Sequence, residues 1–155
     1  MDIQLLSGQQ IAPWIDALAD LRIRVFREFP YLYDGSREYE AQYLSTYLRS
    51  PDSLCVLVQD QGQVVGASTA LPLADETDEF KQPFVEQGWD CERIFYCAES
   101  VVLPEWRGKG LGVRFFAERE GHARRLGRFD WSAFCAVQRP ADHPRRPADY
   151  QPLNT

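Results

Sequence analysis

A glycine-rich turn at residues 107–112 combines the residue types best suited to bind an anion. The apolar run 101–103 precedes this turn, and a helical pattern begins at Leu111. Glycines let a backbone approach a phosphate closely, and the first N–H groups of a helix have no partners within it. Arg107 and Lys109 add cationic donors at the same place. The turn therefore predicts an anion site at the start of a helix.

The spacing of the glycines excludes two common phosphate-binding loops. A P-loop requires Ser or Thr after its lysine, whereas Lys109 is followed by Gly110. A dinucleotide-binding turn requires Gly-x-Gly-x-x-Gly, whereas the glycines here lie at positions 108, 110 and 112. A tight strand-to-helix connection that binds nothing is the remaining alternative.

The turn resembles the acyl-CoA pyrophosphate loop of the GNAT superfamily of N-acyltransferases. That motif is Arg or Gln, two residues, Gly, one residue, then Gly or Ala, and Arg107, Gly110 and Gly112 fit it. Val102-Leu103-Pro104 stands where the family commonly has Val-x-Pro. The resemblance implies acetyl-CoA as acyl donor, with no metal. The cofactor-binding residues that it implies are Ser100, Val101 and Val102 along the pantetheine arm, and Arg107, Gly108, Lys109, Gly110, Leu111 and Gly112 around the pyrophosphate.

Length and composition predict one soluble domain. A chain of 155 residues buries about two thirds of its unfolded surface in one core. It has no apolar run near the roughly 20 residues that span a bilayer, and its first residues lack the basic start of a signal peptide. We therefore expect a cytoplasmic protein without a membrane partner. The cysteines are expected to be buried free thiols without zinc: Cys55, Cys91, Cys97 and Cys135.

The net charge of −6 is unevenly distributed along the chain. Residues 75–105 carry nine acids against two bases, and residues 106–155 carry ten bases against five acids. An anionic donor beside the basic part and a cationic amine near the acidic part would suit this division, although a solvated surface explains it equally well. Overall acidity argues against a nucleic-acid partner.

Apolar periodicity predicts alternating strands and helices, hence an α/β fold with a mixed sheet. Strands are expected at 3–6, 53–60, 63–73, 92–103 and 129–137, and helices at 11–26, 37–48, 75–88 (interrupted at Pro83) and 111–126. Gln61-Gly62 predicts a two-residue hairpin. This order resembles the GNAT domain over residues 1–137.

Residues 138–155 form a Pro/Arg-rich extension without helical or strand periodicity. GNAT proteins usually continue here with a helix and two strands, which are missing. We therefore expect either a truncated chain or a second subunit, as in a homodimer, that covers the exposed sheet edge.

The resemblance implies direct attack of a neutral amine on the thioester, with a carboxylate as base. Glu99 is the candidate, since a carboxylate in an apolar strand is costly to bury unless paired. Strand alternation places Glu99 on the face opposite Ser100, unless the β-bulge that the family has in this strand turns its side chain. The alternative is a structural residue, either on a solvent-exposed face or paired with an arginine. Tyr150 is the candidate acid, as the only tyrosine after the last expected strand. Cys135 is expected to pack in the core, and His122, in the middle of a helix, is expected to be solvated.

The acceptor is expected to meet the segment between the first two helices, where Phe29, Tyr31 and Tyr33 lie close to Asp34. Aromatic rings with one carboxylate would suit an amine with an apolar body, although the same residues suit ordinary packing. The leading hypothesis is an N-acetyltransferase acting on a primary amine of a small molecule or peptide. The alternatives are a non-catalytic acyl-CoA-binding or regulatory module, and a domain used only for protein contacts.

Overall fold

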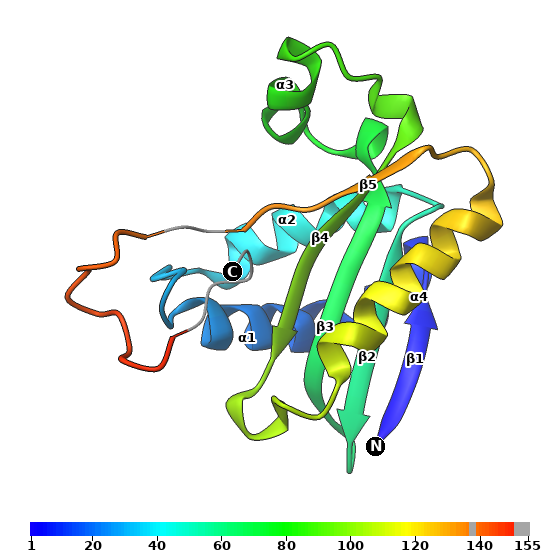
Figure 1. Cartoon of the computed structure of the whole chain (residues 1–155). Coiled ribbons are helices and arrows are strands. Elements are labelled where there is room, and N and C mark those ends of the chain that lie inside the picture. The colour runs from blue at the N-terminus through cyan, green and yellow to red at the C-terminus, as the bar shows by residue number, and fades with distance from the viewer. Residues whose placement is uncertain (137–138, 151–155) are drawn as a thin grey trace.

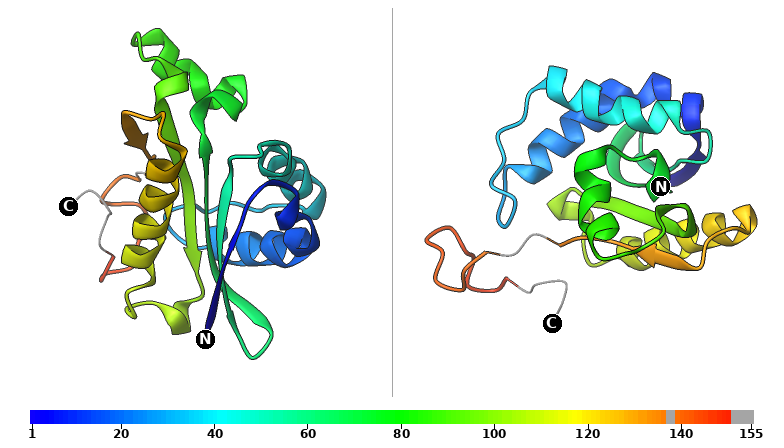
Figure 2. Two further views of the ribbon diagram at one scale, coloured as in Figure 1. Left: turned by 90° about the vertical axis from the view of Figure 1, so that its right-hand side faces the viewer. Right: turned by 90° about the horizontal axis from the view of Figure 1, so that it is seen from above.

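The computed structural model describes residues 1–136 and 139–150, which form a five-stranded sheet covered by helices on both faces (Figures 1 and 2). The strands are β1 (Asp2–Leu6), β2 (Leu54–Asp60), β3 (Gln63–Pro72), β4 (Ile94–Val102) and β5 (Trp131–Ala133). The helices are α1 (Ile15–Phe26), α2 (Arg37–Arg49), α3 (Asp78–Glu86) and α4 (Leu111–Leu126). The short 3-10 helices are η1 (Gly8–Trp14), η2 (Leu73–Asp75), η3 (Cys91–Arg93) and η4 (Pro104–Trp106).

The strand order is β1-β2-β3-β4-β5, with β1 to β4 antiparallel and β5 parallel to β4. Helices α1 and α2 cover one face of the sheet and α4 covers the other, which Figure 2 shows from the side. This is the α/β fold with a mixed sheet that the sequence predicts.

The hairpin between β2 and β3 is confirmed at Gln61 and Gly62. Both residues have positive φ, 51° and 79°, as a two-residue turn matched to strand twist requires. The long apolar strands β2 and β3 are therefore joined by a two-residue turn, and they form the centre of the core.

Three predicted elements differ from the structure. The helix expected at 11–26 is divided into η1 and α1, because Pro13 in η1 has no N–H to donate. Helix α3 continues through Pro83, which removes only one hydrogen bond from a short exposed helix. Strand β5 ends at Ala133, far short of residue 137, which lies outside the described residues.

The core lies between the sheet and the apolar faces of α1 and α4. Leu18, Leu21 and Val25 of α1 are buried, as are Leu111 and Phe115 of α4. None of the helices in the described part of the chain is long and apolar enough to cross a membrane.

The prediction of four buried cysteines is wrong in part. Cys55 and Cys97 are buried and Cys91 is half-buried, but Cys135 is exposed. The reason is that β5 ends two residues earlier, so Cys135 lies outside the sheet. All four thiols are free.

Candidate active site

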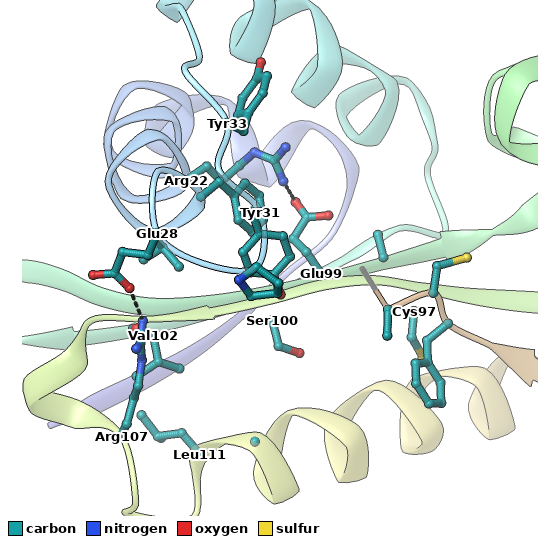
Figure 3. Close-up of a pocket in the computed structure, with 18 of the residues that line it drawn as sticks. Arg22, Glu28, Tyr31, Tyr33, Cys97, Glu99, Ser100, Val102, Arg107 and Leu111 are labelled. Atoms are coloured by element: carbon teal, nitrogen blue, oxygen red, sulfur yellow. Dashed lines mark hydrogen bonds and ion pairs between the residues drawn. The ribbon is translucent and has the colours of Figure 1, made fainter. Parts of the chain in front are cut away.

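A β-bulge in β4 determines which face of the sheet each candidate side chain occupies. In the pairing of β3 with β4, Thr69 is opposite Glu99 and Ala70 is opposite Cys97, so Ala98 is the extra residue. Before the bulge, Phe95 packs against His122 of α4. After it, Glu99 points to the opposite side, toward α1, and Ser100 points toward α4 (Figure 3). In regular alternation Glu99 would share the face of Phe95 and Cys97, so the bulge is what turns it toward α1.

Arg22 of α1 lies between two carboxylates. Its guanidinium donates Nε–H to Glu40 and an Nη1–H to Glu99, the second of which Figure 3 marks. Its side chain is only 8% exposed, that of Glu99 11% and that of Glu40 fully buried. Burial acts to lower the pKa of Arg22, but the charge of Glu99 and the hydrogen bond to Glu40 outweigh it and raise that pKa. The arginine is therefore a permanent cation shared by both acids.

Two tyrosines of α2 extend this network. The Tyr43 hydroxyl donates to Glu99 Oε2 at 3.0 Å and lies 3.1 Å from the Tyr47 hydroxyl. Burial, followed by the charge of Glu99, raises the pKa of Tyr43 well above its ordinary value. The Arg22 guanidinium also lies 4.3 Å from the centre of the Tyr43 ring. Both Glu99 oxygens are thus held, one by Arg22 and one by Tyr43.

The glycine turn leaves open space over the start of α4. Gly108 and Gly110 have φ of 74° and 83°, and Gly110 is the N-cap of α4, which has no side-chain cap. A Cβ at Gly108, Gly110 or Gly112 would meet no atom within 4 Å. The backbone here is therefore accessible to an anion, and the N-terminal amides of α4 face no capping side chain.

Arg107 is already occupied. Its Nε–H donates to the Val102 carbonyl at 3.0 Å, and an Nη2–H donates to Glu28 Oε2 at 3.2 Å, the pair marked in Figure 3. Both ionic side chains are nearly half exposed, so this surface pair contributes about 0–1 kcal/mol. A phosphate at the turn would compete with Glu28 for the guanidinium.

Among the residues that the structure describes, no strand pairs with the β5-facing edge of β4 beyond Tyr96. Strand β5 pairs with β4 only over residues 94–96, and the two strands then separate. The segment of β4 that includes Ser100, Val101 and Val102 therefore offers main-chain groups on that side to a ligand that binds like an added strand, except for the Val102 carbonyl, which accepts from Arg107.

The predicted acceptor residues lie in the same cavity as Glu99. Phe29, Tyr31 and Tyr33 line it together with Tyr150, and Phe29 and Tyr150 are in edge contact at 4.9 Å between ring centres. The cavity has a volume of about 1070 Å³, and residues 108, 110 and 112 of the glycine turn border it as well. Most of the sequence-predicted donor and acceptor residues thus surround one continuous space, whereas Val101 is buried and lies outside its wall. Of the two cationic residues in the turn, Arg107 lines the cavity and Lys109 does not.

Two buried arginines were missed by sequence reasoning. Arg119 of α4 is 1% exposed; it donates to the Glu99 carbonyl at 3.2 Å and to Ser100 Oγ at 3.0 Å. Burial lowers its pKa. The available signal was helical spacing, since Arg119 follows buried Phe115 by four residues and Arg22 follows buried Leu18 by four. A charged residue on an apolar helix face requires a buried partner, and Arg22 and Arg119 each have at least one.

His122 is half-buried and held by the backbone instead of solvated, whereas Cys135 does not pack in the core: it is exposed and lines the cavity. A ring nitrogen of His122 lies 2.9 Å from the Asp52 carbonyl, which ties α4 to the loop before β2. Among residues 1–136 and 139–150, no group of three His, Cys, Asp or Glu side chains is placed to hold a metal ion.

The family model described as acetyltransferase (GNAT) family matches residues 15–144, which include the network around Glu99 and the whole glycine turn. The chain belongs to the GNAT acetyltransferase family. No protein of curated function matches the sequence.

Solved GNAT structures share the fold at low sequence identity. An aminoglycoside N-acetyltransferase, AAC(6')-Iy, in complex with CoA is 15% identical, with a TM-score of 0.57 over 88% of this chain and 76% of that one. A possible acetyltransferase from Clostridium difficile 630 is 10% identical, with a TM-score of 0.63 over 88% and 80%. An aminoglycoside acetyltransferase from an uncultured soil metagenomic sample, in complex with sisomicin, is 17% identical, with a TM-score of 0.56 over 88% and 78%.

Proposed function

We propose that this GNAT protein transfers an acetyl group from acetyl-CoA to a primary amine of a small molecule or peptide by direct attack. The observation that carries the proposal is the bulge at Ala98, which turns Glu99 into the cavity bordered by the glycine turn and the open edge of β4. The CoA complex of the similar aminoglycoside N-acetyltransferase supports the choice of donor.

The donor would be held by two parts of the chain. The backbone of Ser100, Val101 and Val102 would pair with the pantetheine arm, since β5 leaves that edge of β4 free. The turn from Arg107 to Gly112 would receive the pyrophosphate, because its glycines leave open space over the α4 amides. In this arrangement Arg107 exchanges Glu28 for phosphate.

An acceptor that binds as an ammonium loses one proton to Glu99 before attack, and the second N–H proton, which leaves after the C–N bond forms, balances the proton that the leaving sulfur gains. The amine nitrogen bonds to the carbonyl carbon of the thioester, and the carbon–sulfur bond breaks to release the CoA thiolate. Glu99 would accept the amine proton: its carboxylate has about four acceptor positions, and Arg22 and Tyr43 occupy one each. Tyr150, in the wall of the same cavity, would give a proton to the thiolate.

The test is thiol release from acetyl-CoA with a panel of amines. The protein is expected to turn over at least one amine, and Glu99→Gln is expected to lower kcat about 100-fold or more, as loss of a general base does. CoA should still raise the Tm of Glu99→Gln, because the glycine turn is unchanged. Glu92→Gln, at an exposed position of η3, is the matched control and should keep full activity. Unchanged kcat in Glu99→Gln would contradict the role of this residue.

One observation favours a second candidate, a non-catalytic acyl-CoA-binding module. Arg22 and Tyr43 each hold one oxygen of Glu99, which would also suit a carboxylate that anchors the buried network and accepts no proton. This candidate predicts that CoA raises the Tm of the folded protein while no amine in the panel causes thiol release.

A further inference from the structure

Every element around the acceptor side of the cavity contributes an aromatic ring to its wall. Its rings form nearly continuous contacts, with Tyr33 and Tyr39 at 5.9 Å, Tyr43 and Phe80 at 6.3 Å, and Phe80 and Tyr96 at 6.1 Å between ring centres. These rings come from the α1–α2 segment, α2, α3 and β4. The surface offered to a ligand is therefore rich in aromatic rings, which are tilted to one another.

Charged groups in the wall are few and mostly neutralised. The carboxylates are Glu28, Glu99 and Asp149, and Glu28 is paired with Arg107. Asp149 is exposed at the rim. Only Glu99 lies deep in the cavity.

Arg22, Glu40 and Glu99 together carry one negative charge in excess, which Arg119 offsets only in part, because it contacts the main-chain carbonyl of Glu99 and not its carboxylate. Arg22 is shared by Glu99 and Glu40, so one cation faces two carboxylates. One oxygen of Glu40 is buried without a hydrogen-bond partner. A single ammonium group at Glu99 would complete the charge balance, since an unbalanced buried charge is costly.

Further ammonium groups would meet cations. Arg22 and Arg107, each with a carboxylate partner, line the cavity together with Arg119. Arg119 pairs with carbonyl groups and Ser100, and with no carboxylate in the part of the chain that the structure describes. Like charges in a poorly solvated space repel strongly.

We propose that the acceptor is a monoamine with an aromatic or other apolar body, and not a polycation such as an aminoglycoside or a polyamine. Its ammonium group meets Glu99, and its body lies against the rings of Tyr33, Tyr43 and Phe80. This inference rests on the proposed function, because it specifies the substrate of the same site.

The experiment compares amines in the thiol-release assay with acetyl-CoA. We expect kcat/KM for 2-phenylethylamine to exceed that for spermidine and for kanamycin at least tenfold, with butylamine in between. Tyr33→Ala should raise KM for 2-phenylethylamine several-fold and leave KM for butylamine nearly unchanged. The CoA-induced rise in Tm, measured for each variant, verifies that the donor site and the fold are intact.

Two outcomes would overturn the inference, and they are distinguishable. Equal or faster turnover of spermidine or kanamycin would show an acetyltransferase with a different acceptor, so the proposed function would stand without the inference. A rise in Tm with CoA but no turnover of any amine would remove the proposed function and the inference together.

Discussion

At the scale of single residues, Arg22 is the side chain that holds the two buried carboxylates of the site in place. It is buried between Glu40 and Glu99, and both Phe26 and Tyr43 stack on its guanidinium. Removing one partner of a buried ion pair leaves the other charge unbalanced. Arg22 therefore fixes the orientation of Glu99 and is a positioning residue.

Arg22→Met is expected to lower the free energy of unfolding by about 3–5 kcal/mol, because two buried carboxylates lose their shared cation. Arg24→Met is the control on the same helix, since Arg24 is more than half exposed and lies 3.9 Å from Glu105. Its effect should stay within about 1 kcal/mol. Urea denaturation of both variants measures the difference. Equal stabilities would show that the buried network contributes nothing to the fold.

At the scale of elements, the glycine turn can be predicted from the sequence and the bulge cannot. The turn could be predicted because its residues are contiguous and Gly110 adopts a left-handed φ that favours glycine. The bulge at Ala98 could not be located from the sequence, since it depends on the register of β3 against β4. Helical spacing places Arg22 and Arg119 on apolar faces, but their partners lie 18 to 77 and 19 to 50 residues away.

Gly110→Ala is expected to abolish most of the CoA-induced rise in Tm, because it adds a methyl group in the space over the start of α4. It should also destabilise the protein by about 1 kcal/mol, since alanine is strained at φ +83°.

Gly88→Ala separates these two effects. Gly88 follows α3, also has φ +83°, and has no atom within 4 Å of an added Cβ. The variant should show a similar loss of stability and a normal response to CoA. If both variants respond to CoA like the original protein, the turn does not bind the donor.

At the scale of the whole molecule, the order of the elements along the chain and the aromatic segment from Phe29 to Asp34 follow from local patterns, whereas the strand order in the sheet and the closing of the cavity do not. Residues 139–150 have no strand or helix, as the sequence predicts, yet they lie against the α1–α2 segment, as Figure 1 shows. A segment without periodicity gives no sign of its partner, so only the three-dimensional structure shows that Tyr150 meets Phe29.

Buried hydroxyls and thiols make the stability of the whole domain depend on alkaline pH. Burial raises the pKa of Cys55 to about 12 and that of Tyr43 and Tyr47 well above 10. The native state thus holds these protons more tightly than the unfolded chain. Their contribution is complete below the unfolded values near 9 and 10, and is lost as the pH rises through the folded values.

We therefore expect the free energy of unfolding in urea to decline steadily from about pH 9 to pH 11. Tyr47→Phe should make this decline shallower, because it removes one of the titrating groups. Tyr39→Phe, at an exposed position, is the control and should leave the slope unchanged. A stability that is constant up to pH 11 would contradict the burial of these groups.

Arg139 joins the two segments that close the acceptor side of the cavity. It donates to the Pro30 carbonyl at 2.7 Å and to the Tyr31 carbonyl at 3.0 Å. Hydrogen bonds from a charged donor contribute about 1.5–3 kcal/mol each, less where solvent competes. Arg139→Ala should therefore speed amide hydrogen exchange in residues 29–33 and raise KM for the acceptor amine several-fold.

The response to CoA should remain normal in Arg139→Ala, because the glycine turn lies between β4 and α4, away from this contact. Arg145→Ala is the matched control, since Arg145 is exposed in the same segment and its side chain makes no hydrogen bond or ion pair with the described residues. Normal exchange and KM in Arg139→Ala would mean that the C-terminal segment covers the cavity without shaping it. A raised KM confined to Arg139→Ala would instead assign acceptor binding to both segments.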